Sequence, residues 1–296
     1  MAQNFDPVYK EIENYGIIPI IKTEDAEIAL AAAKALSAGG LNVAEMIFET
    51  EKAEKAAEKI IAALPGTLLV AGGAKSKKQA KGAADSGAKA IITDGFDAKM
   101  AECCENLGIP LLIKIKNAEE TKKMPEAKFI VDSANPDDFA KHLSNKALLA
   151  CSIDIIPQEA YAGGFGEIKK LAAHAVQKML GYDLAHVGIN CENAEQAERD
   201  SGRVEAIFGL EKTDAGATFS NADILHFTKQ RSYGKNGQIA ISANFIDRAL
   251  FYLKQAGRQF IEESARYDEQ GILASIYLDN IIGGFAIKLV RRETNG

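Results

Sequence analysis

A glutamate interrupts an otherwise apolar stretch of the chain. The segment GGLNVAEMIFET, residues 39–50, contains a short apolar run that is typical of a buried strand, and Glu45 lies inside that run. A carboxylate within a buried strand is costly unless it pairs with a cation or takes part in chemistry. Two interpretations follow: Glu45 forms an ion pair with a buried lysine, or it transfers protons in a reaction at the end of the strand.

Strands and helices alternate through the first part of the chain. The expected strands are the apolar segments 16–23, 43–48, 67–73, 88–95, 109–115, 128–134 and 147–153. Helical segments, among them 52–64, 98–107 and 167–180, follow several of these strands. Such alternation predicts a parallel sheet with right-handed crossovers. We therefore predict an α/β fold, a TIM-like barrel that is degenerate because one strand–helix unit is missing, unless a short eighth strand lies within 116–126.

The pattern changes after Gly181. Strands with two-residue alternation and turn signals replace the alanine-rich helices. The expected strands are 183–190, 217–220, 223–228, 238–243, 259–261, 271–278 and 285–290, with helices at 194–208 and 245–256. This order resembles βαβββ repeated twice, with three strands assigned in the first repeat and four in the second, and it predicts an α+β domain of two similar halves. We predict two domains, residues 1–180 and 181–296.

Composition and charge exclude several classes of function. The net charge is −6 and the lysines and arginines are dispersed, which argues against nucleic acid as a partner. No apolar stretch approaches the roughly 20 residues that cross a bilayer, and the N-terminus lacks the apolar core of a signal peptide. The four cysteines have no metal-type spacing. We therefore expect no membrane partner and a cytoplasmic location.

Four segments carry a resemblance to a known enzyme family. GIIPIIKTEDAEIALAAAKAL, VAEMIFET, VAGGAKSKKQAKGAADSGAKAIITDGF and ENLGIPLLI resemble the class I aldolases that act on 2-keto-3-deoxy-6-phosphogluconate and 4-hydroxy-2-oxoglutarate. The resemblance covers residues 16–113 and, more loosely, 128–180. It implies a lyase that cleaves a 4-hydroxy-2-oxo acid to pyruvate and an aldehyde through a lysine Schiff base, with Glu45 as the proton shuttle. Thr50 and Lys22 are the candidate substrate-binding residues.

The resemblance also implies partners. A small keto acid is the expected ligand, and aldolases of this family are commonly trimeric. A barrel that lacks one unit is further expected to expose an apolar edge, and such edges tend to be covered by another chain. We therefore predict a homo-oligomer, a trimer rather than a dimer.

The chain departs from the family at residues that would contact substrate. Family members carry an arginine four residues after the glutamate, where this chain has Glu49. The reversed charge would repel an anionic keto acid. Where the family places phosphate-binding glycines at strand ends, this chain has Asp132 and Asp154, which disfavour phosphate.

The Schiff-base lysine is also affected. The segment KFIVDSAN, beginning at Lys128, looks like the lysine strand of the family, but the segments after it align it with the next family strand. The lysine strand is therefore expected to be deleted within residues 115–124. Lys114 and Lys128 remain as candidate Schiff-base lysines. In the other interpretation Lys114, or next Lys22, neutralises Glu45 and is no nucleophile.

The second half resembles another family. LGYDLAHVGINCEN, YGKNGQIAISANFIDRALFYLKQAG and EESARYDEQGILASIYLDNIIGGFAIKLV are similar to the vicinal-oxygen-chelate (VOC, glyoxalase-like) module. The resemblance implies a metal site at four positions, which by register are His186, His226, Gln238 and Lys288. Two imidazoles and an amide could hold a divalent ion, whereas the ammonium of Lys288 has no lone pair. A divalent metal and a pair of histidines without metal both remain open. The other histidines, His142 and His174, fall on expected helices and are assigned no function.

Two functional hypotheses follow. In the first, the protein is an aldolase homologue that has lost Schiff-base catalysis, a pseudoenzyme acting as a ligand-binding or partner subunit. In the second, it is an active lyase that uses Glu45 with Lys114 or Lys128. The combined loss of the lysine strand, the arginine, the phosphate glycines and one metal ligand favours the first. Neither hypothesis requires a cofactor.

Overall fold

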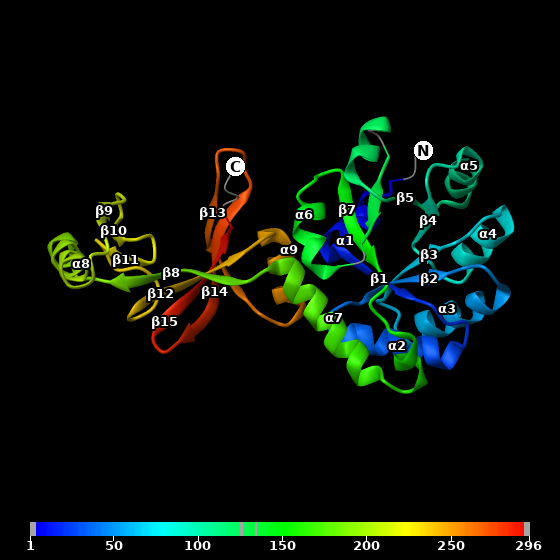
Figure 1. Ribbon diagram of the computed structural model, residues 1–296, viewed down its shortest axis with the longest axis horizontal. Coiled ribbons are helices and arrows are strands. Elements are labelled where there is room, and N and C mark those ends of the chain that lie inside the picture. Colours follow the sequence, from blue (N-terminus) through cyan, green and yellow to red (C-terminus); the bar gives the residue numbers. More distant parts are fainter. Residues whose placement is uncertain (1–3, 125–126, 134, 293–296) are drawn as a thin grey trace. The chain divides into compact units, whose positions relative to one another are not determined.

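The computed structural model describes residues 4–124, 127–133 and 135–292. The chain divides into two compact units, Met1–Met179 and Leu180–Gly296 (Figure 1). This division lies next to the change of sequence pattern after Gly181. Within the described ranges, no helix has both the length and the apolar character that crossing a membrane requires.

Seven parallel strands close into a barrel in the first unit. They are β1 (Ile17–Ile21), β2 (Val43–Ile47), β3 (Leu68–Gly72), β4 (Ala90–Asp94), β5 (Leu111–Ile115), β6 (Phe129–Asp132) and β7 (Leu148–Ile153). Each strand pairs with the next, and β7 returns to pair with β1, so the sheet has no free edge. The predicted seven-stranded α/β barrel is confirmed. The prediction that a missing unit would leave an exposed sheet edge was wrong, because the seven strands close the barrel.

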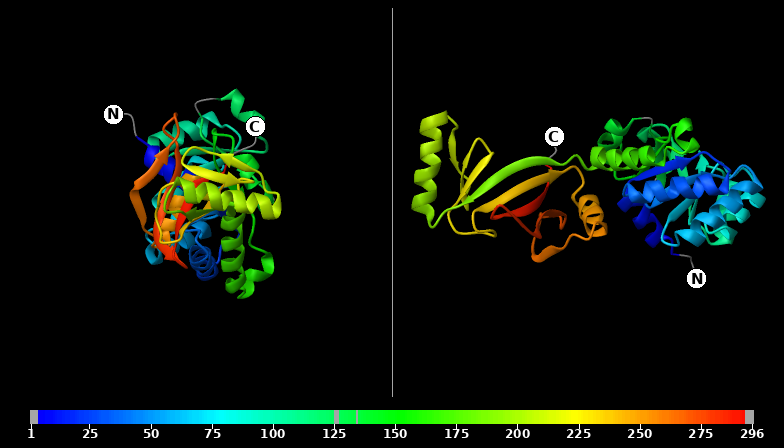
Figure 2. Two further views of the ribbon diagram at one scale, coloured as in Figure 1. Left: turned by 90° about the vertical axis from the view of Figure 1, so that its left-hand side faces the viewer. Right: turned by 90° about the horizontal axis from the view of Figure 1, so that it is seen from below.

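Helices surround the barrel, as Figures 1 and 2 show. They include α2 (Ala26–Ala38), α3 (Glu51–Ala63), α4 (Lys77–Asp85), α5 (Ala98–Leu107), α6 (Phe139–Leu143) and α7 (Phe165–Leu180). Polar residues end the loops that lead into these helices. The side chains of Asp25, Thr50 and Ser76 accept hydrogen bonds from backbone N–H groups of α2, α3 and α4, which satisfies donors that lack a partner within the helix. Buried alanines on the inner helix faces allow the helices to pack closely on the strands.

Two features of the first unit were not predicted. Helix α1 (Asp6–Tyr15) precedes β1, buries Ile12 and Tyr15, and ends at Gly16 with a left-handed backbone. Its few apolar residues give only a weak helical pattern in the sequence. Between β5 and β6, residues Ala118–Lys123 form a 3₁₀ helix, so the described residues of 116–126 contain no eighth strand. Residues 125–126, and Ala134 at the end of the predicted sixth strand, lie outside the described residues.

The second unit is an eight-stranded mixed sheet with the order β13-β14-β15-β12-β8-β11-β10-β9. Its strands are β8 (Asp183–Asn190), β9 (Lys212–Asp214), β10 (Thr218–Asn221), β11 (Leu225–Thr228), β12 (Gly237–Ala243), β13 (Phe260–Tyr267), β14 (Leu273–Ile282) and β15 (Phe285–Arg291). In each half the first strand pairs in parallel with the last, β8 with β11 and β12 with β15. The two first strands pair antiparallel. The two halves therefore have the same connectivity. Of the eight strands, only the short β9 was not predicted from the sequence.

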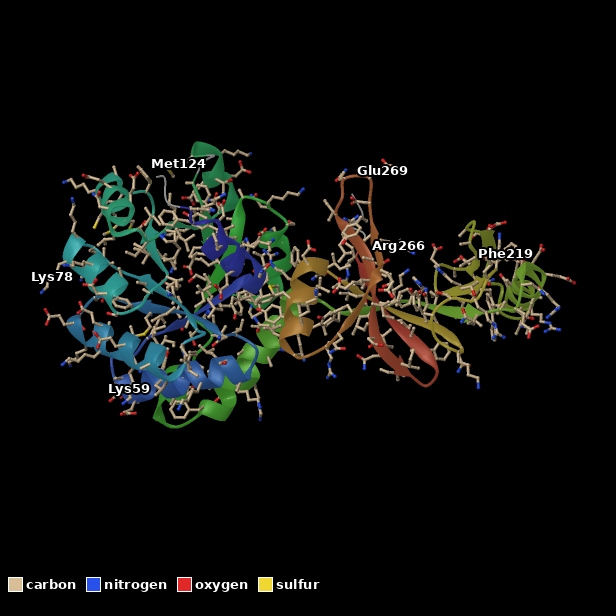
Figure 3. All side chains as sticks on the ribbon, turned by 180° about the vertical axis from the view of Figure 1, so that it is seen from behind. Lys59, Lys78, Met124, Phe219, Arg266 and Glu269 are labelled. Atoms are coloured by element: carbon tan, nitrogen blue, oxygen red, sulfur yellow. The ribbon has the colours of Figure 1, made fainter. Side chains whose placement is uncertain are left out.

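One helix belongs to each half, α8 (Ala194–Phe208) and α9 (Ile246–Gln255). In the first half, Ala197 of α8 packs in one cluster with Phe219 and Phe227 of the sheet, and Figure 3 labels Phe219. Successive side chains of a strand point to opposite faces. His226, next to Phe227, therefore lies on the face of the sheet that α8 does not cover.

Candidate functional site

Three side chains from different strands meet inside the barrel. Lys114 Nζ on β5 donates to Glu45 Oε1 at 2.8 Å and to Oε2 at 3.0 Å. Ser152 Oγ on β7 donates to Oε2 at 2.6 Å. Strands β2 and β5 are not neighbours in the sheet, so this contact requires both side chains to point into the barrel. The predicted pairing of Glu45 with Lys114 is confirmed.

This pair is withdrawn from solvent. The side chain of Glu45 is 1% exposed and that of Lys114 is 13% exposed. Gly72 on β3 makes room for the carboxylate, because a Cβ atom at this position would overlap with Glu45 Oε1. An ammonium that donates to a carboxylate has its lone pair occupied by a proton, so it is not a nucleophile in this arrangement.

The other candidate residues of the barrel lie apart from this pair. Lys22 Nζ binds Asp154 Oδ2 at 2.6 Å, and both side chains are about half exposed. Thr50 donates to Glu24 Oε1 at 2.5 Å and accepts from the first turn of α3. Their predicted substrate-binding roles stay predictions.

Lys128 lies at the other end of the barrel. It immediately precedes β6 and is exposed, and its Nζ lies 5.8 Å from the ring centroid of Tyr9 on α1. In a parallel barrel the strand starts share one end, whereas side chains that act on substrate lie at the strand ends. The structure thus brings Lys114 to Glu45 and leaves Lys128 away from it.

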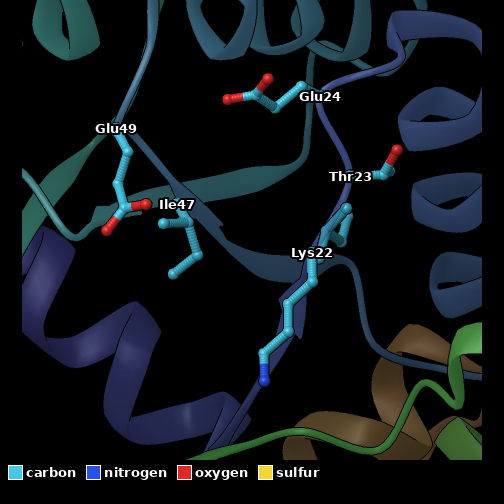
Figure 4. A pocket seen from close by; sticks show the side chains of 6 residues that line it. Lys22, Thr23, Glu24, Ile47 and Glu49 are labelled. Carbon is cyan, nitrogen blue, oxygen red and sulfur yellow. The ribbon is translucent and has the colours of Figure 1, made fainter.

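A cavity of about 330 Å³ opens where β1 and β2 end. Its lining comprises Ile21, Lys22, Thr23, Glu24, Ile47 and Glu49, and Figure 4 shows Lys22 extending away from Glu24. Two carboxylates therefore face this space, while the one ammonium in the lining is already paired with Asp154. Such a lining disfavours a small carboxylic acid anion.

The second unit gathers the four positions that register predicted. The rings of His186 and His226 stack with centroids 4.1 Å apart. The amide nitrogen of Gln238 lies 3.1 Å from His186 Nε2, and the amide oxygen of Gln238 accepts a hydrogen bond from the hydroxyl of Tyr277. Lys288 Nζ lies 5.5 Å from the centroid of the Tyr277 ring. Tyr277 was not predicted from the sequence, because a tyrosine in an apolar strand such as LASIYLDNII is common and does not indicate a site.

Burial and nearby positive charge lower the pKa of both imidazoles. The pKa of His186 is lowered to about 4, chiefly by burial and then by His226 and Lys288. Burial is also the largest cause that lowers the pKa of His226. The pKa of Lys288 is lowered by burial and then by the charge of Arg266. Arg266 lies on β13 (Figure 3).

The donor chemistry of this cluster does not fit a divalent metal. Gln238 already hydrogen bonds to His186 through its nitrogen and to Tyr277 through its oxygen. Lys288 brings a positive charge to the fourth position. Nowhere in the described ranges do three or more His, Cys, Asp or Glu side chains form a group that could hold a metal ion. His186, His226 and Gln238 therefore lack the anionic or additional neutral ligands that a metal would need.

Comparison with known proteins relates the first unit to aldolases. Residues 8–129 match the family model described as "KDPG and KHG aldolase". This stretch is a KDPG/KHG aldolase family domain. The matched range covers less than half of the 296 residues.

Individual relatives agree with this assignment. The 2-dehydro-3-deoxy-phosphogluconate aldolases of Haemophilus influenzae and Treponema pallidum are each 29% identical to 40% of this chain. The chain spans only about half the length of these relatives, 55% and 57%. The KHG/KDPG aldolase of Escherichia coli is 26% identical over 54% of this chain and 91% of the relative. The aldolase family domain is thus homologous to these lyases at modest identity.

Solved structures show the same fold. KDPG aldolase from Legionella pneumophila, captured with pyruvate as a covalent carbinolamine intermediate, aligns with a TM-score of 0.51 and 22% identity. The alignment covers 57% of this chain and 97% of that one. The KDPG aldolase of Zymomonas mobilis with 3-phosphoglycerate aligns with a TM-score of 0.50 and 22% identity. That alignment covers 59% of this chain and 96% of the Zymomonas chain. At this identity the likeness concerns the barrel fold alone.

Proposed function

We propose that the aldolase family domain has lost Schiff-base catalysis and acts as a ligand-binding or partner subunit. The observation that carries this proposal is the closed arrangement of Glu45. Both of its oxygens accept from Lys114, and Ser152 donates to one of them. A proton shuttle must reach a substrate or water, and this carboxylate is 1% exposed.

The electrostatics of the barrel mouth support the same proposal. Glu24 and Glu49 line the cavity at the ends of β1 and β2, and Asp132 lies at the end of β6 with its side chain exposed. A keto acid would bring its own carboxylate into this acidic setting, and like charges repel at short distance. The acidic barrel mouth therefore disfavours the keto acid that the aldolase resemblance implies as a ligand.

The second candidate function is an active lyase. The contact between Lys114 and Glu45 favours it, because a Schiff-base lysine and its proton shuttle must lie within reach of one another. In that case Lys114 would give its proton to Glu45 and attack the keto carbon of the substrate, and the keto oxygen would leave as water when the Schiff base forms. Lys128 has no role in either candidate function, because it lies at the end of the barrel where the strands begin, away from Glu45.

Retro-aldol activity distinguishes the two functions. We expect no release of pyruvate from 2-keto-3-deoxy-6-phosphogluconate or 4-hydroxy-2-oxoglutarate above the rate without protein, measured by a coupled lactate dehydrogenase assay. Glu45→Gln should leave that background unchanged. Turnover in the parent that disappears in both Glu45→Gln and Lys114→Arg, but persists in Lys128→Met, would establish the lyase.

We further propose that the second unit is a VOC-like domain, that the protein is a cytoplasmic homo-oligomer, and that a trimer is its favoured form. The shared connectivity of the two βαβββ halves supports the first point. The four cysteines, all buried and in no disulfide, suit a reducing compartment. The trimer rests on the aldolase resemblance, because the closed barrel removes the edge argument.

A further inference from the structure

An asparagine followed by a glycine lies in the turn that leads into β12. The sequence YGKNG ends with Asn236 and Gly237, and Asn236 is exposed. A side-chain amide in this position is open to attack by the backbone nitrogen of the next residue, because glycine has no Cβ atom that would shield its nitrogen. The other such step in the sequence, Asn295-Gly296, lies outside the described residues.

The fold requires the glycine of this step. Gly237 has a backbone φ of 128°, which L side chains rarely adopt. A Cβ atom at this position would lie 2.0 Å from the carbonyl oxygen of Gly188 on β8. Any other residue at position 237 would therefore push β12 away from β8.

The fold also uses the side chain of the asparagine. Asn236 Nδ2 donates to the carbonyl oxygen of Gly283 at 3.0 Å, and the backbone N–H of Asn236 donates to that of Gly284 at 2.9 Å. These two glycines connect β14 to β15. The backbone carbonyl of Asn236 accepts from the N–H of Asn190, the last residue of β8, at 3.0 Å. Asn236 thus joins the β14–β15 turn to the first strand of the other half.

We infer that Asn236 is a site of spontaneous deamidation, which loosens the β14–β15 turn irreversibly. The backbone nitrogen of Gly237 attacks Asn236 Cγ and forms a C–N bond, and the side-chain amide nitrogen leaves as ammonia with the proton of the attacking nitrogen. Water then opens the cyclic imide at one of its two C–N bonds, which gives aspartate or isoaspartate. The inference concerns the second unit alone and goes beyond the function proposed for the barrel.

Either product loses the contact with Gly283. A carboxylate accepts hydrogen bonds but donates none, so it would face the carbonyl oxygen of Gly283 as a second acceptor. Isoaspartate also adds one carbon to the backbone and turns the carbonyl that accepts from Asn190 into a free carboxylate. The hydrogen bonds of Asn236 restrict the movement that brings the nitrogen of Gly237 to Cγ, so the folded protein is expected to react more slowly than the unfolded chain.

Incubation of the full chain in mildly alkaline water enriched in ¹⁸O, followed by peptide mapping, measures the reaction, because a site that reacts takes up one labelled oxygen. Asn236 is expected to take up label in the folded chain, at a rate at least about tenfold below its rate in the chain unfolded with guanidinium chloride. Asn190 and Asn244, which precede a cysteine and a phenylalanine, should stay unlabelled over the same time.

Asn236→Asp reproduces one product and tests the consequence. Hydrogen exchange of a peptide that covers the β14–β15 turn is expected to be about fivefold faster in this variant, the effect of one lost hydrogen bond. Lys235→Gln is the matched control, because it changes the net charge by the same amount at the exposed neighbouring residue and leaves the contact with Gly283 in place. Should Asn236→Asp fail to fold, the deamidated and intact fractions of aged parent protein, separated by ion exchange, provide the same comparison.

Three results would each overturn the inference. The first is an Asn236 that stays unlabelled in the folded chain while it is labelled in the unfolded chain. The second is an equal rate of labelling in the two states. The third is equal hydrogen exchange of the turn in Asn236→Asp, or in the deamidated fraction, and in the corresponding control.

Discussion

Replacing Lys114 by Met is expected to lower the free energy of unfolding of the first unit by about 3–5 kcal/mol. Among the described residues, the substitution leaves the Glu45 carboxylate, which is 1% exposed, with the hydroxyl of Ser152 as its one remaining partner. Removing one member of a buried ion pair exposes the full desolvation cost of the other. Urea unfolding followed by circular dichroism measures the change.

Lys22→Met is the matched control for this prediction. Lys22 also forms a lysine–carboxylate pair, with Asp154, but about half of each side chain is exposed, so its loss should cost less than about 1 kcal/mol. The double variant Glu45→Met/Lys114→Met should recover much of the stability lost in Lys114→Met, since no buried charge remains. Equal effects of Lys114→Met and Lys22→Met, or additive losses in the double variant, would contradict a buried pair.

The second unit should lose stability as the pH falls from 7 to 5. His186 has a folded pKa of about 4 against about 6.5 in an unfolded chain. Below pH 6.5 the imidazole of the unfolded state binds a proton, whereas the imidazole of the folded state binds one only near pH 4. Proton binding therefore stabilises the unfolded state relative to the folded state. The stabilisation present above pH 6.5 is therefore lost through this window, by about 1–2 kcal/mol at pH 5 after allowance for the partly exposed ring.

Hydrogen exchange of peptides from β8 and β12, corrected for intrinsic rates, measures this loss unit by unit. A chelator removes any metal that could protect the histidines. His186→Gln should flatten the pH dependence, because an amide keeps a polar side chain without titrating. Unchanged or greater protection of β8 at pH 5 would show that His186 is not held neutral in the folded protein.

Much of the fold follows from regular patterns in the sequence. Continuous apolar runs predicted all seven barrel strands within a few residues, because strands covered on both faces leave no polar positions. The segments 98–107, 183–190 and 194–208 agree with α5, β8 and α8 residue for residue. Helix α1 and the short β9 were missed, since their stability comes from contacts with residues distant in sequence rather than from local pattern.

The site was predictable only in part. Glu45 was identified because it is a charged residue inside an apolar run. Lys114 was identified because two-residue alternation along the fifth strand fixes the face on which its side chain lies. Ser152 gave a fainter signal of the same kind, a hydroxyl within the buried segment ALLACSI. The role of Gly72 could not be read from sequence, because it depends on where the Glu45 side chain lies across the barrel.

Borohydride reduction in the presence of pyruvate, followed by intact mass and peptide mapping, tests the loss of Schiff-base catalysis most directly. The KDPG aldolase of Legionella pneumophila, whose structure holds pyruvate as a covalent carbinolamine intermediate, serves as the positive control under the same conditions. Because Lys114 is held as an ammonium against Glu45, we predict that the protein keeps its unmodified mass while the control gains the reduced adduct. A stoichiometric adduct on Lys114 that is absent in Glu45→Gln would contradict the proposal and identify the protein as an active lyase.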